Sequence, residues 1–285
     1  MIYATFHKGR ALLTGERISP ALVFNCGQAF RFDPFADGYL GVACGRVLFT
    51  RETNAGLELS PVTPGEYATV WAHYFDAALD YPVLEAEFAR DPLLASALPC
   101  CRGMRLLNQP LFETLISFII SANNNVSRIK GIINKLCLLA GRPLSFCGLT
   151  LYDFPSPAAL ASLSEEQLTA CGCGYRAKYI QKTARMVADG FPLESLVQMD
   201  YAAAREVLMK FPGVGSKVAD CVLLFACGKK DAFPEDVWIH RVLCTQYGFC
   251  AKNHAQLREF VLRRFGAYGG IAQQYLFHCA RTNQL

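Results

Sequence analysis

Residues 211–221 read "FPGVGSKVADC", and this stretch decides the fold of the second part of the chain. The Ala-rich segment 200–211 starts with an Asp and, as a helix, must end before Pro212. Segment 216–228 has apolar residues at positions 218, 221, 222 and 225, which is the spacing of one helix face, and it ends at a Gly. The sequence therefore predicts a helix, a tight "PGVG" turn and a second helix.

The turn offers a place for an anion, because glycines at the start of a helix expose backbone N–H groups at the positive end of the helix dipole. Gly213 and Gly215 would therefore suit a phosphate. The spacing matches neither the GxxxxGK[ST] nor the GxGxxG motif, since Ser216 alone separates Gly215 from Lys217 and a Val follows. A helical hairpin without a ligand fits the pattern equally well.

Lys217 lies in the first turn of the second helix, where the helix dipole disfavours a positive charge. This position favours the neutral amine, which is the form that attacks an electrophile. A lysine that binds phosphate would instead stay protonated, and the residues alone leave both roles open. Segment 229–236 is just long enough to return the chain to the start of the helix. We therefore expect Asp236 to lie near Lys217 and to cap the next helix.

The 285-residue chain is 52% apolar, which indicates a folded protein with a substantial core. Residues 39–52 and 56–62 have strand patterns, whereas the chain from residue 110 onward has mostly helical periodicity. We therefore predict an α+β protein. An N-terminal antiparallel β-sheet domain with helices would span residues 1–98, and an all-helical domain residues 99–285. Residues 21–35 are expected to form two short extended pieces around Gly27.

Charge is unevenly distributed along the chain. Residues 1–100 hold 7 Lys/Arg and 11 Asp/Glu, whereas residues 101–285 hold 21 and 13. The basic second part is compatible with a polyanionic partner, although an ordinary uneven surface fits equally well. No apolar run approaches the ~18 residues of a membrane span, and the N-terminus lacks the features of a signal peptide. We therefore expect an intracellular protein without a membrane partner.

The 13 cysteines are scattered and mostly embedded in apolar segments. The "CC" at 100–101 and the "CGC" at 171–173 have poor spacing for zinc, and no pair of CxxC motifs occurs. We therefore expect reduced thiols, no metal site, no iron–sulfur cluster and no cofactor.

Five motifs in order give the chain a family resemblance. With Lys217 and Asp236 in place, it resembles the helix-hairpin-helix DNA glycosylases, and most of all the 8-oxoguanine DNA glycosylase family. The resemblance covers nearly the whole chain. The motifs are "NCGQAFRF" (25–32), "SFIISANNNVSRI" (117–129), "CGYRAKY" (173–179), "GVGSKVADC" (213–221) with "FPEDVWIHR" (233–241), and "IAQQYLF" (271–277).

The resemblance implies a helix-hairpin-helix glycosylase domain and an enzyme that removes 8-oxoguanine opposite cytosine from duplex DNA by flipping the base out of the stack. Lys217 would attack the anomeric carbon, expel the base and form a Schiff base, after which β-elimination nicks the strand. Asp236 would stabilise the positive charge that develops on the sugar. We expect a monomer in the cytoplasm (nucleoid) or nucleus, with DNA containing oxidised guanine as its partner.

The resemblance also assigns contacts around the flipped base. The Gly27 carbonyl would accept the N7 hydrogen that 8-oxoguanine has and guanine lacks, and Gln273 would bind the Watson–Crick edge. Phe277 and Cys221 would cover the two faces of the base. Residue type alone would favour plain core packing for Phe277 and Cys221.

On the opposite strand, the resemblance makes Tyr175 the wedge that fills the space left by the flipped base. Asn123, Arg128 and Arg176 would read the orphaned cytosine. From residue type alone, Asn123 would simply end an apolar helix, and both arginines would be solvated charges.

Gly213, Gly215 and Trp238 are expected to contact DNA phosphates. The chain departs from the resemblance at Trp238 and Ala280, where the family often has a histidine and an acid. The indole N–H of Trp238 is then the candidate phosphate donor. Two other functions fit parts of this pattern: a glycosylase of the same fold for an alkylated base or oxidised pyrimidine, and a non-catalytic DNA-binding module.

Overall fold

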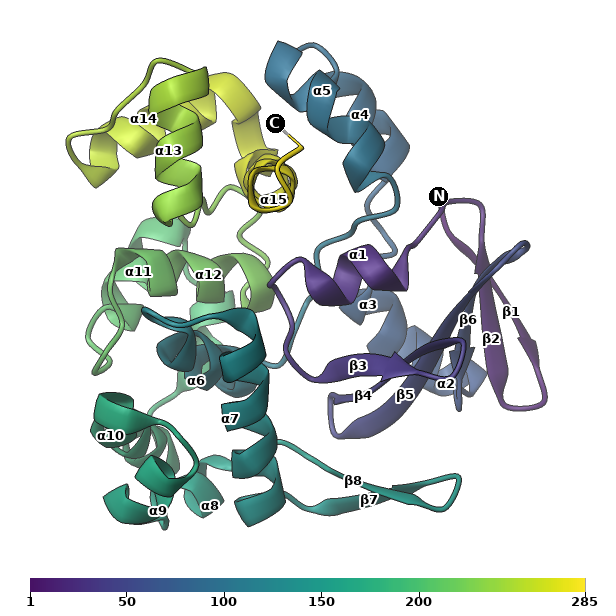
Figure 1. Ribbon diagram of the computed structural model, residues 1–285, viewed down its shortest axis with the longest axis vertical. Helices are drawn as coiled ribbons and strands as arrows, with labels where there is room; N and C mark the ends of the chain where they lie inside the picture. Colours follow the sequence, from purple (N-terminus) through teal and green to yellow (C-terminus); the bar gives the residue numbers. More distant parts are fainter. Residues whose placement is uncertain (285) are drawn as a thin grey trace.

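The computed structural model describes residues 1–284, and in it a six-stranded antiparallel sheet stands beside a larger body of helices (Figure 1). The strand order is β1-β2-β6-β5-β4-β3. This arrangement confirms the predicted α+β class and the N-terminal antiparallel sheet. The strands are β1 (Tyr3–His7), β2 (Arg10–Thr14), β3 (Phe32–Phe35), β4 (Gly38–Ala43), β5 (Arg46–Thr53) and β6 (Gly56–Ser60).

The sheet has its own apolar core. Buried residues alternate with more exposed ones in β2 and β6, which is the period of a half-buried strand, and Leu13, Leu57 and Leu59 point inward. Trp71 and Tyr74 belong to the same core. The short helical elements of this part are α1 (Pro20–Asn25), α2 (Pro64–Glu66), the π-helical turn η1 (Tyr67–Trp71) and α3 (Ala72–Tyr74).

The larger core is built around α6 (Leu111–Ser121), which is buried along most of its length. Helices α7 (Val126–Ala140) and α12 (Ser216–Ala226) pack against α6. The other elements are α4 (Tyr81–Phe88), α5 (Pro92–Cys101), β7 (Pro143–Phe146), β8 (Leu149–Tyr152), α8 (Pro157–Ala161), α9 (Glu165–Ala170), η2 (Gly174–Arg176), α10 (Ala177–Ala188), η3 (Leu193–Val197), α11 (Tyr201–Leu208), α13 (Val237–Gln246), α14 (His254–Phe265), η4 (Gly266–Tyr268) and α15 (Gly269–Arg281).

The predicted helix, turn and helix are confirmed as α11, the "PGVG" turn and α12. Asp200 caps α11 by accepting a hydrogen bond from the Ala203 N–H at 2.8 Å. Gly213 has a φ of 79°, and a Cβ at this position would lie 2.7 Å from the Tyr179 ring. Only glycine therefore fits this point of the turn. Gly215 is the N-cap of α12.

Two segments differ from the predicted pattern. Residues 20–25 form helix α1 and not an extended piece, because Pro20 occupies the first turn, where its fixed φ suits a helix. The second part, otherwise helical, contains the β7–β8 hairpin. Its turn residues Cys147 and Gly148 have φ values of 46° and 79°, and positive φ at both positions is typical of a type I′ hairpin turn.

The predicted boundary between residues 98 and 99 lies inside α5. Leu94 and Ala97 of this helix belong to the larger core, and α5 packs against α15 at the other end of the sequence. Helices α4 and α5 thus join the helical part in space, and a division at residue 98 stays a prediction. Among the described residues, no helix has the length and apolar character needed to cross a membrane.

Candidate active site

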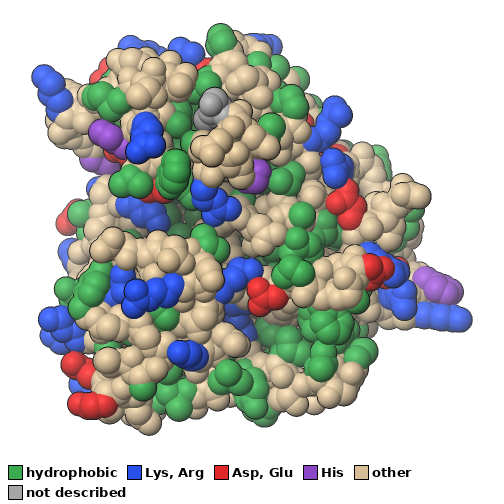
Figure 2. Space-filling view, viewed as in Figure 1, with side chains coloured by type: hydrophobic (Ala, Val, Ile, Leu, Met, Phe, Trp, Pro, Cys, Tyr) green, Lys and Arg blue, Asp and Glu red, His purple; other side chains and the backbone are tan. Residues whose placement is uncertain are grey.

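An open cavity of about 840 Å³ lies where the start of α12, the start of α13 and the end of α6 meet α15 and the loop after α1. Figure 2 shows a hollow in this region, with Lys and Arg side chains near its rim. Lys217 and Asp236 both line the cavity, as the sequence predicted from the length of the connecting segment.

The Lys217 amine is half-buried and has few partners. Its Nζ lies 3.4 Å from the Ser121 Oγ and 5.1 Å from the centroid of the Phe118 ring. No carboxylate of the described chain forms an ion pair with it. The amine therefore faces the cavity without a fixed counter-charge, which leaves it free to approach a ligand.

Asp236 is held rigidly at the start of α13. Its Oδ1 accepts hydrogen bonds from the N–H groups of Trp238 and Ile239, both at 3.0 Å. This confirms the predicted cap. The other oxygen, Oδ2, has no hydrogen-bond partner in the described chain and lies at the cavity. A carboxylate fixed in this way can stabilise a cation that forms beside it without first reorganising.

The four residues assigned to the base pocket meet beside Lys217 and Asp236. Gly27, Cys221, Gln273 and Phe277 line a narrow extension of the cavity, with a volume of about 40 Å³. This space is close to that of one water molecule. A base can therefore enter only if a side chain moves, and the half-buried Phe277, which lines both the large cavity and this extension, is the candidate.

Two of these side chains have unusual environments. Burial raises the pKa of the Cys221 thiol to about 11, so it stays neutral. Gln273 is buried, and its Oε1 has no hydrogen-bond partner in the described chain. Buried polar atoms without partners are rare, so this oxygen is suited to accept a hydrogen bond from a ligand in the pocket.

The residues assigned to the opposite base surround an exposed turn between α6 and α7. Asn123 is exposed, with a φ of 50°, and Arg128 is exposed on the first turn of α7. Neither side chain makes a hydrogen bond within the described chain. Tyr175 is 55% exposed, and its hydroxyl lies 3.5 Å from the Ala122 carbonyl. All three are accessible to DNA.

Arg176 lies in a different environment from the other residues of this group. Its guanidinium is buried and donates hydrogen bonds to the carbonyls of Ala122 and Asn123. It also lies over the Tyr175 ring, 4.4 Å from the centroid. In this structure Arg176 holds the turn through Nε and Nη2, while its Nη1 makes no hydrogen bond in the described chain.

The residues assigned to DNA phosphates lie at the surface beside the cavity. Gly213 and Gly215 are exposed in the turn before α12, and open space surrounds the α-carbon of Gly215. Trp238 lines the large cavity, with the Arg241 guanidinium 5.6 Å from the centroid of its ring.

Comparison with known proteins identifies the family. The model of the HhH-GPD superfamily base excision DNA repair protein matches residues 116–266, and that of the 8-oxoguanine DNA glycosylase N-terminal domain matches residues 11–115. The chain is 37% identical over 218 residues, or 70% of each chain, to the probable N-glycosylase/DNA lyase of Methanothermobacter thermautotrophicus. The chain belongs to the 8-oxoguanine DNA glycosylase family.

Other members of this family extend the match over the full chain. The N-glycosylase/DNA lyase OGG1 of Arabidopsis thaliana is 29% identical over 285 residues, 93% of this chain and 78% of that one. The Clostridium acetobutylicum 8-oxoguanine glycosylase/lyase, solved with dsDNA containing cytosine opposite 8-oxoG, aligns with a TM-score of 0.94 at 35% identity. The alignment covers 100% of this chain and 99% of that one.

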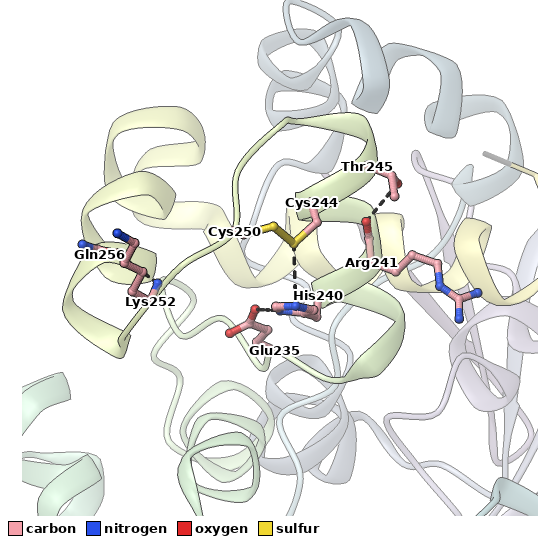
Figure 3. The surroundings of a disulfide bond; sticks show 8 residues. All are labelled: Glu235, His240, Arg241, Cys244, Thr245, Cys250, Lys252 and Gln256. Carbon is pink, nitrogen blue, oxygen red and sulfur yellow. Dashed lines mark hydrogen bonds and ion pairs between the residues drawn. A yellow bond between two sulfur atoms is a disulfide. The ribbon is translucent and has the colours of Figure 1, made fainter.

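The expectation that all thiols are reduced is wrong for one pair of cysteines in this glycosylase. Cys244 of α13 and Cys250 of the following loop form a disulfide (Figure 3). The sequence offers no spacing motif for this pair, because the loop that brings the two sulfurs together is irregular. Next to it, His240 lies 3.6 Å from the Cys244 sulfur and 2.8 Å from Glu235, the residue before Asp236.

The motifs of the glycosylase family did not point to every residue at the cavity. Ser121 and Phe118 lie within the quoted segment 117–129, but nothing in their spacing indicates a contact with Lys217. Arg281 also lines the cavity, from the last turn of α15. In the described residues, no cluster of three or more His, Cys, Asp or Glu side chains has the arrangement of a metal site.

Proposed function

We propose that Lys217 is the nucleophile with which this enzyme excises 8-oxoguanine paired with cytosine from duplex DNA and nicks the strand. Removal of 8-oxoguanine and strand cleavage are the activities of the glycosylase/lyase family to which the chain belongs. The observation that carries the residue assignment is the Lys217 amine without a counter-ion, in one cavity with the Asp236 carboxylate.

In the first step, the lone pair of the Lys217 amine forms a bond to C1′ as the C1′–N9 bond breaks. The base leaves with the electron pair of the C1′–N9 bond and takes a proton from the new ammonium group. Positive charge develops on the sugar in this step, and the free Oδ2 of Asp236 stabilises it.

In the second step, the C1′–O4′ bond opens, O4′ takes up a proton from solvent, and a protonated imine remains between Nζ and C1′. This imine acidifies the hydrogens on C2′. Transfer of a C2′ proton to solvent then breaks the C3′–O bond, and the 3′ phosphate leaves with the electron pair of that bond. None of these steps needs a cofactor.

Base recognition follows from the groups that line the narrow pocket. The Gly27 carbonyl accepts the N7 hydrogen of the lesion, and Gln273 Oε1 accepts a hydrogen from its Watson–Crick edge. Phe277 and Cys221 cover its two faces. Guanine has no N7 hydrogen, so the Gly27 carbonyl would be left buried and unpaired against it.

The exposed turn between α6 and α7 contacts the DNA strand opposite the lesion. Tyr175 fills the gap in the stack, and Asn123 and Arg128 contact the orphaned cytosine, joined by Arg176 through its unbonded Nη1. Gly213, Gly215 and Trp238 hold phosphates. The enzyme works where the DNA is, inside the cell, and we propose that it acts there as a monomer, in the cytoplasm (nucleoid) or the nucleus.

Borohydride trapping on a duplex with 8-oxoguanine opposite cytosine tests the assignment of Lys217. The wild type should form a covalent adduct that Lys217→Gln abolishes. Lys210→Gln is the matched control, because Lys210 lies just before the turn, is exposed and, among the described residues, pairs only with Glu206. If Lys217→Gln still formed the adduct, Lys217 would not be the nucleophile. A panel with an alkylated base and an oxidised pyrimidine separates this function from that of related glycosylases.

A further inference from the structure

The loop that carries Gly27 is held by side chains from two parts of the chain, helix α15 and the segment before α6. The carbonyls of Asn25, Cys26 and Gln28 each accept a hydrogen bond, whereas the Gly27 carbonyl accepts none from the described residues. The loop is therefore fixed with one acceptor left free. The donors are Arg281 Nη2 to Asn25, Gln274 Nε2 to Cys26 at 2.8 Å and Gln109 Nε2 to Gln28 at 2.8 Å.

Arg281 differs from the other two donors because part of its guanidinium faces the cavity. Its Nη1 lies 3.5 Å from the position of a Cβ built on Gly27, and its central carbon lies 5.5 Å from the centroid of the Phe277 ring. Nη1 has no hydrogen-bond partner, and Arg281 no carboxylate partner, in the part of the chain that the structure describes. A free N–H donor thus stands beside the free Gly27 acceptor.

This pair of groups is complementary to one edge of the lesion. In 8-oxoguanine the N7–H donor stands next to the C8 carbonyl acceptor, whereas guanine has an N7 acceptor and a C8–H there. We propose that Arg281 is a specificity-determining residue whose Nη1 donates a hydrogen bond to the C8 carbonyl while Gly27 accepts the N7 hydrogen. This inference rests on the proposed function, since it requires the base to occupy the narrow pocket.

Two further observations favour a contact with the base over one with a phosphate. Arg281 is anchored through Asn25 to the loop that carries Gly27, so its guanidinium lies in the large cavity beside Gly27, a residue that also lines the narrow base pocket. It also lies beside Phe277, the residue assigned to the face of the base. The position before it is Ala280, so no neighbouring acid in the sequence competes for its donors.

The experiment compares Arg281→Met with wild type in single-turnover assays on three duplexes, each opposite cytosine. They contain 8-oxoguanine, 8-thioguanine, which keeps N7–H but has a weak sulfur acceptor at C8, and an abasic site, which has no base. Arg281→Met should release 8-oxoguanine at least ~10-fold more slowly, release 8-thioguanine less than ~3-fold more slowly, and nick the abasic duplex at the wild-type rate. Arg281→Lys, which keeps a donor, should recover part of the loss.

Each other result overturns the inference. An equal loss on both bases would mean that Arg281 only holds the loop, and a loss on the abasic duplex would mean a phosphate contact. If Arg281→Met released 8-oxoguanine at the wild-type rate, the Arg281 side chain would have no role in recognition. Arg263→Met, which removes an exposed charge from α14, controls for a general weakening of DNA binding. If the wild type itself released no 8-oxoguanine, the proposed function would fail instead.

Discussion

At the scale of single residues, the site is defined by polar groups that the fold leaves only partly satisfied. The Lys217 amine has no counter-ion, Asp236 has one free oxygen, and the amide oxygen of Gln273 is buried without a hydrogen bond in the described chain. A buried polar atom without a partner, such as this Gln273 oxygen, breaks a rule that folded proteins usually obey. Together the three groups indicate a pocket that is completed by its ligand.

Gln273→Met should stabilise the free protein while it impairs excision. The substitution removes a buried oxygen that has no partner, so the melting temperature should rise, and release of 8-oxoguanine should slow by at least ~10-fold. Nicking of an abasic duplex should not change. Gln274→Met is the matched control: its Nε2 bonds the Cys26 carbonyl at 2.8 Å, so its loss should lower the melting temperature. A fall in melting temperature for Gln273→Met would contradict the conclusion that the buried Gln273 oxygen has no hydrogen-bond partner in the free protein.

The sequence could predict these residues only where type and order carry the family pattern. Lys217, Asp236, Gln273 and Phe277 stand in motifs, and the structure brings them to one cavity. Arg281 has no such signal, since its role depends on which carbonyl its side chain reaches across the fold.

At the scale of elements, the first turns of α12 and α13 position the two proposed catalytic side chains. Lys217 stands in the first turn of α12 and Asp236 caps α13, so both polar groups are fixed by helix geometry. These starts were predictable because caps and proline are local signals. Helix α1 was not, because its apolar residues 21–24 also fit a short buried strand.

Substitutions at Asp236 should separate capping from catalysis. Asparagine caps a helix as well as aspartate, so Asp236→Asn should keep the stability of the wild type within about 0.5 kcal/mol. It should nevertheless lose most of the excision rate, because the amide cannot stabilise a cation. Asp236→Ala should lose the rate and also about 1 kcal/mol of stability. Chemical denaturation and single-turnover kinetics measure both quantities, and a fully active Asp236→Asn would exclude the charge from the mechanism.

Asp220, on the buried face of α12, should give a pH effect. Burial raises the pKa of its carboxyl to about 6, although the Tyr201 hydroxyl and Arg205 oppose the shift. The carboxyl therefore keeps its proton up to a higher pH in the folded state than in the unfolded state. As a result, the contribution of Asp220 to the free energy of unfolding falls as pH rises from about 4 to about 6. A shift of two pKa units corresponds to roughly 3 kcal/mol.

Carbon NMR of the Asp220 carboxyl should therefore show a midpoint near pH 6, and Arg205→Met should move it higher. The carboxyl must be followed directly, because burial lowers the pKa of neighbouring His254 and this changes stability with pH in the opposite direction. A midpoint near the ordinary value of 3.8 would contradict the expected desolvation.

At the scale of the whole molecule, the sheet part and the helical part meet at the cavity that Lys217 and Asp236 line. Gly27 comes from the loop after α1, Lys217 from α12 and Phe277 from α15, so no single part contains the site. Strands in residues 39–52 and 56–62 and the mainly helical second part were predictable from periodicity, whereas β1, β2, α1 and the β7–β8 hairpin were not predicted. The packing of α5 against α15, and the disulfide between Cys244 and Cys250, were not predictable, because both depend on contacts that no local pattern encodes.

One ion pair joins the sheet part to the segment that carries Asp236. Lys230 Nζ lies 2.7 Å from both carboxylate oxygens of Asp76, which is buried after α3. The backbone of the same lysine accepts a hydrogen bond from the Gly270 N–H at 2.7 Å. The loop between α12 and α13 is thus tied to both the sheet part and α15.

Lys230→Met should therefore destabilise the whole protein as one unit. The change leaves the Asp76 carboxylate buried, with only the Tyr81 hydroxyl at 3.3 Å as a side-chain donor, and breaking a buried pair in this way costs about 3–5 kcal/mol. Lys229→Met is the matched control, because the neighbouring amine is exposed and donates only to the Val197 carbonyl. Calorimetry should show one transition that shifts down by several degrees for Lys230→Met and hardly moves for Lys229→Met. Two transitions, with only one of them shifted, would mean that the sheet and the helices fold independently and that the site between them is assembled after folding.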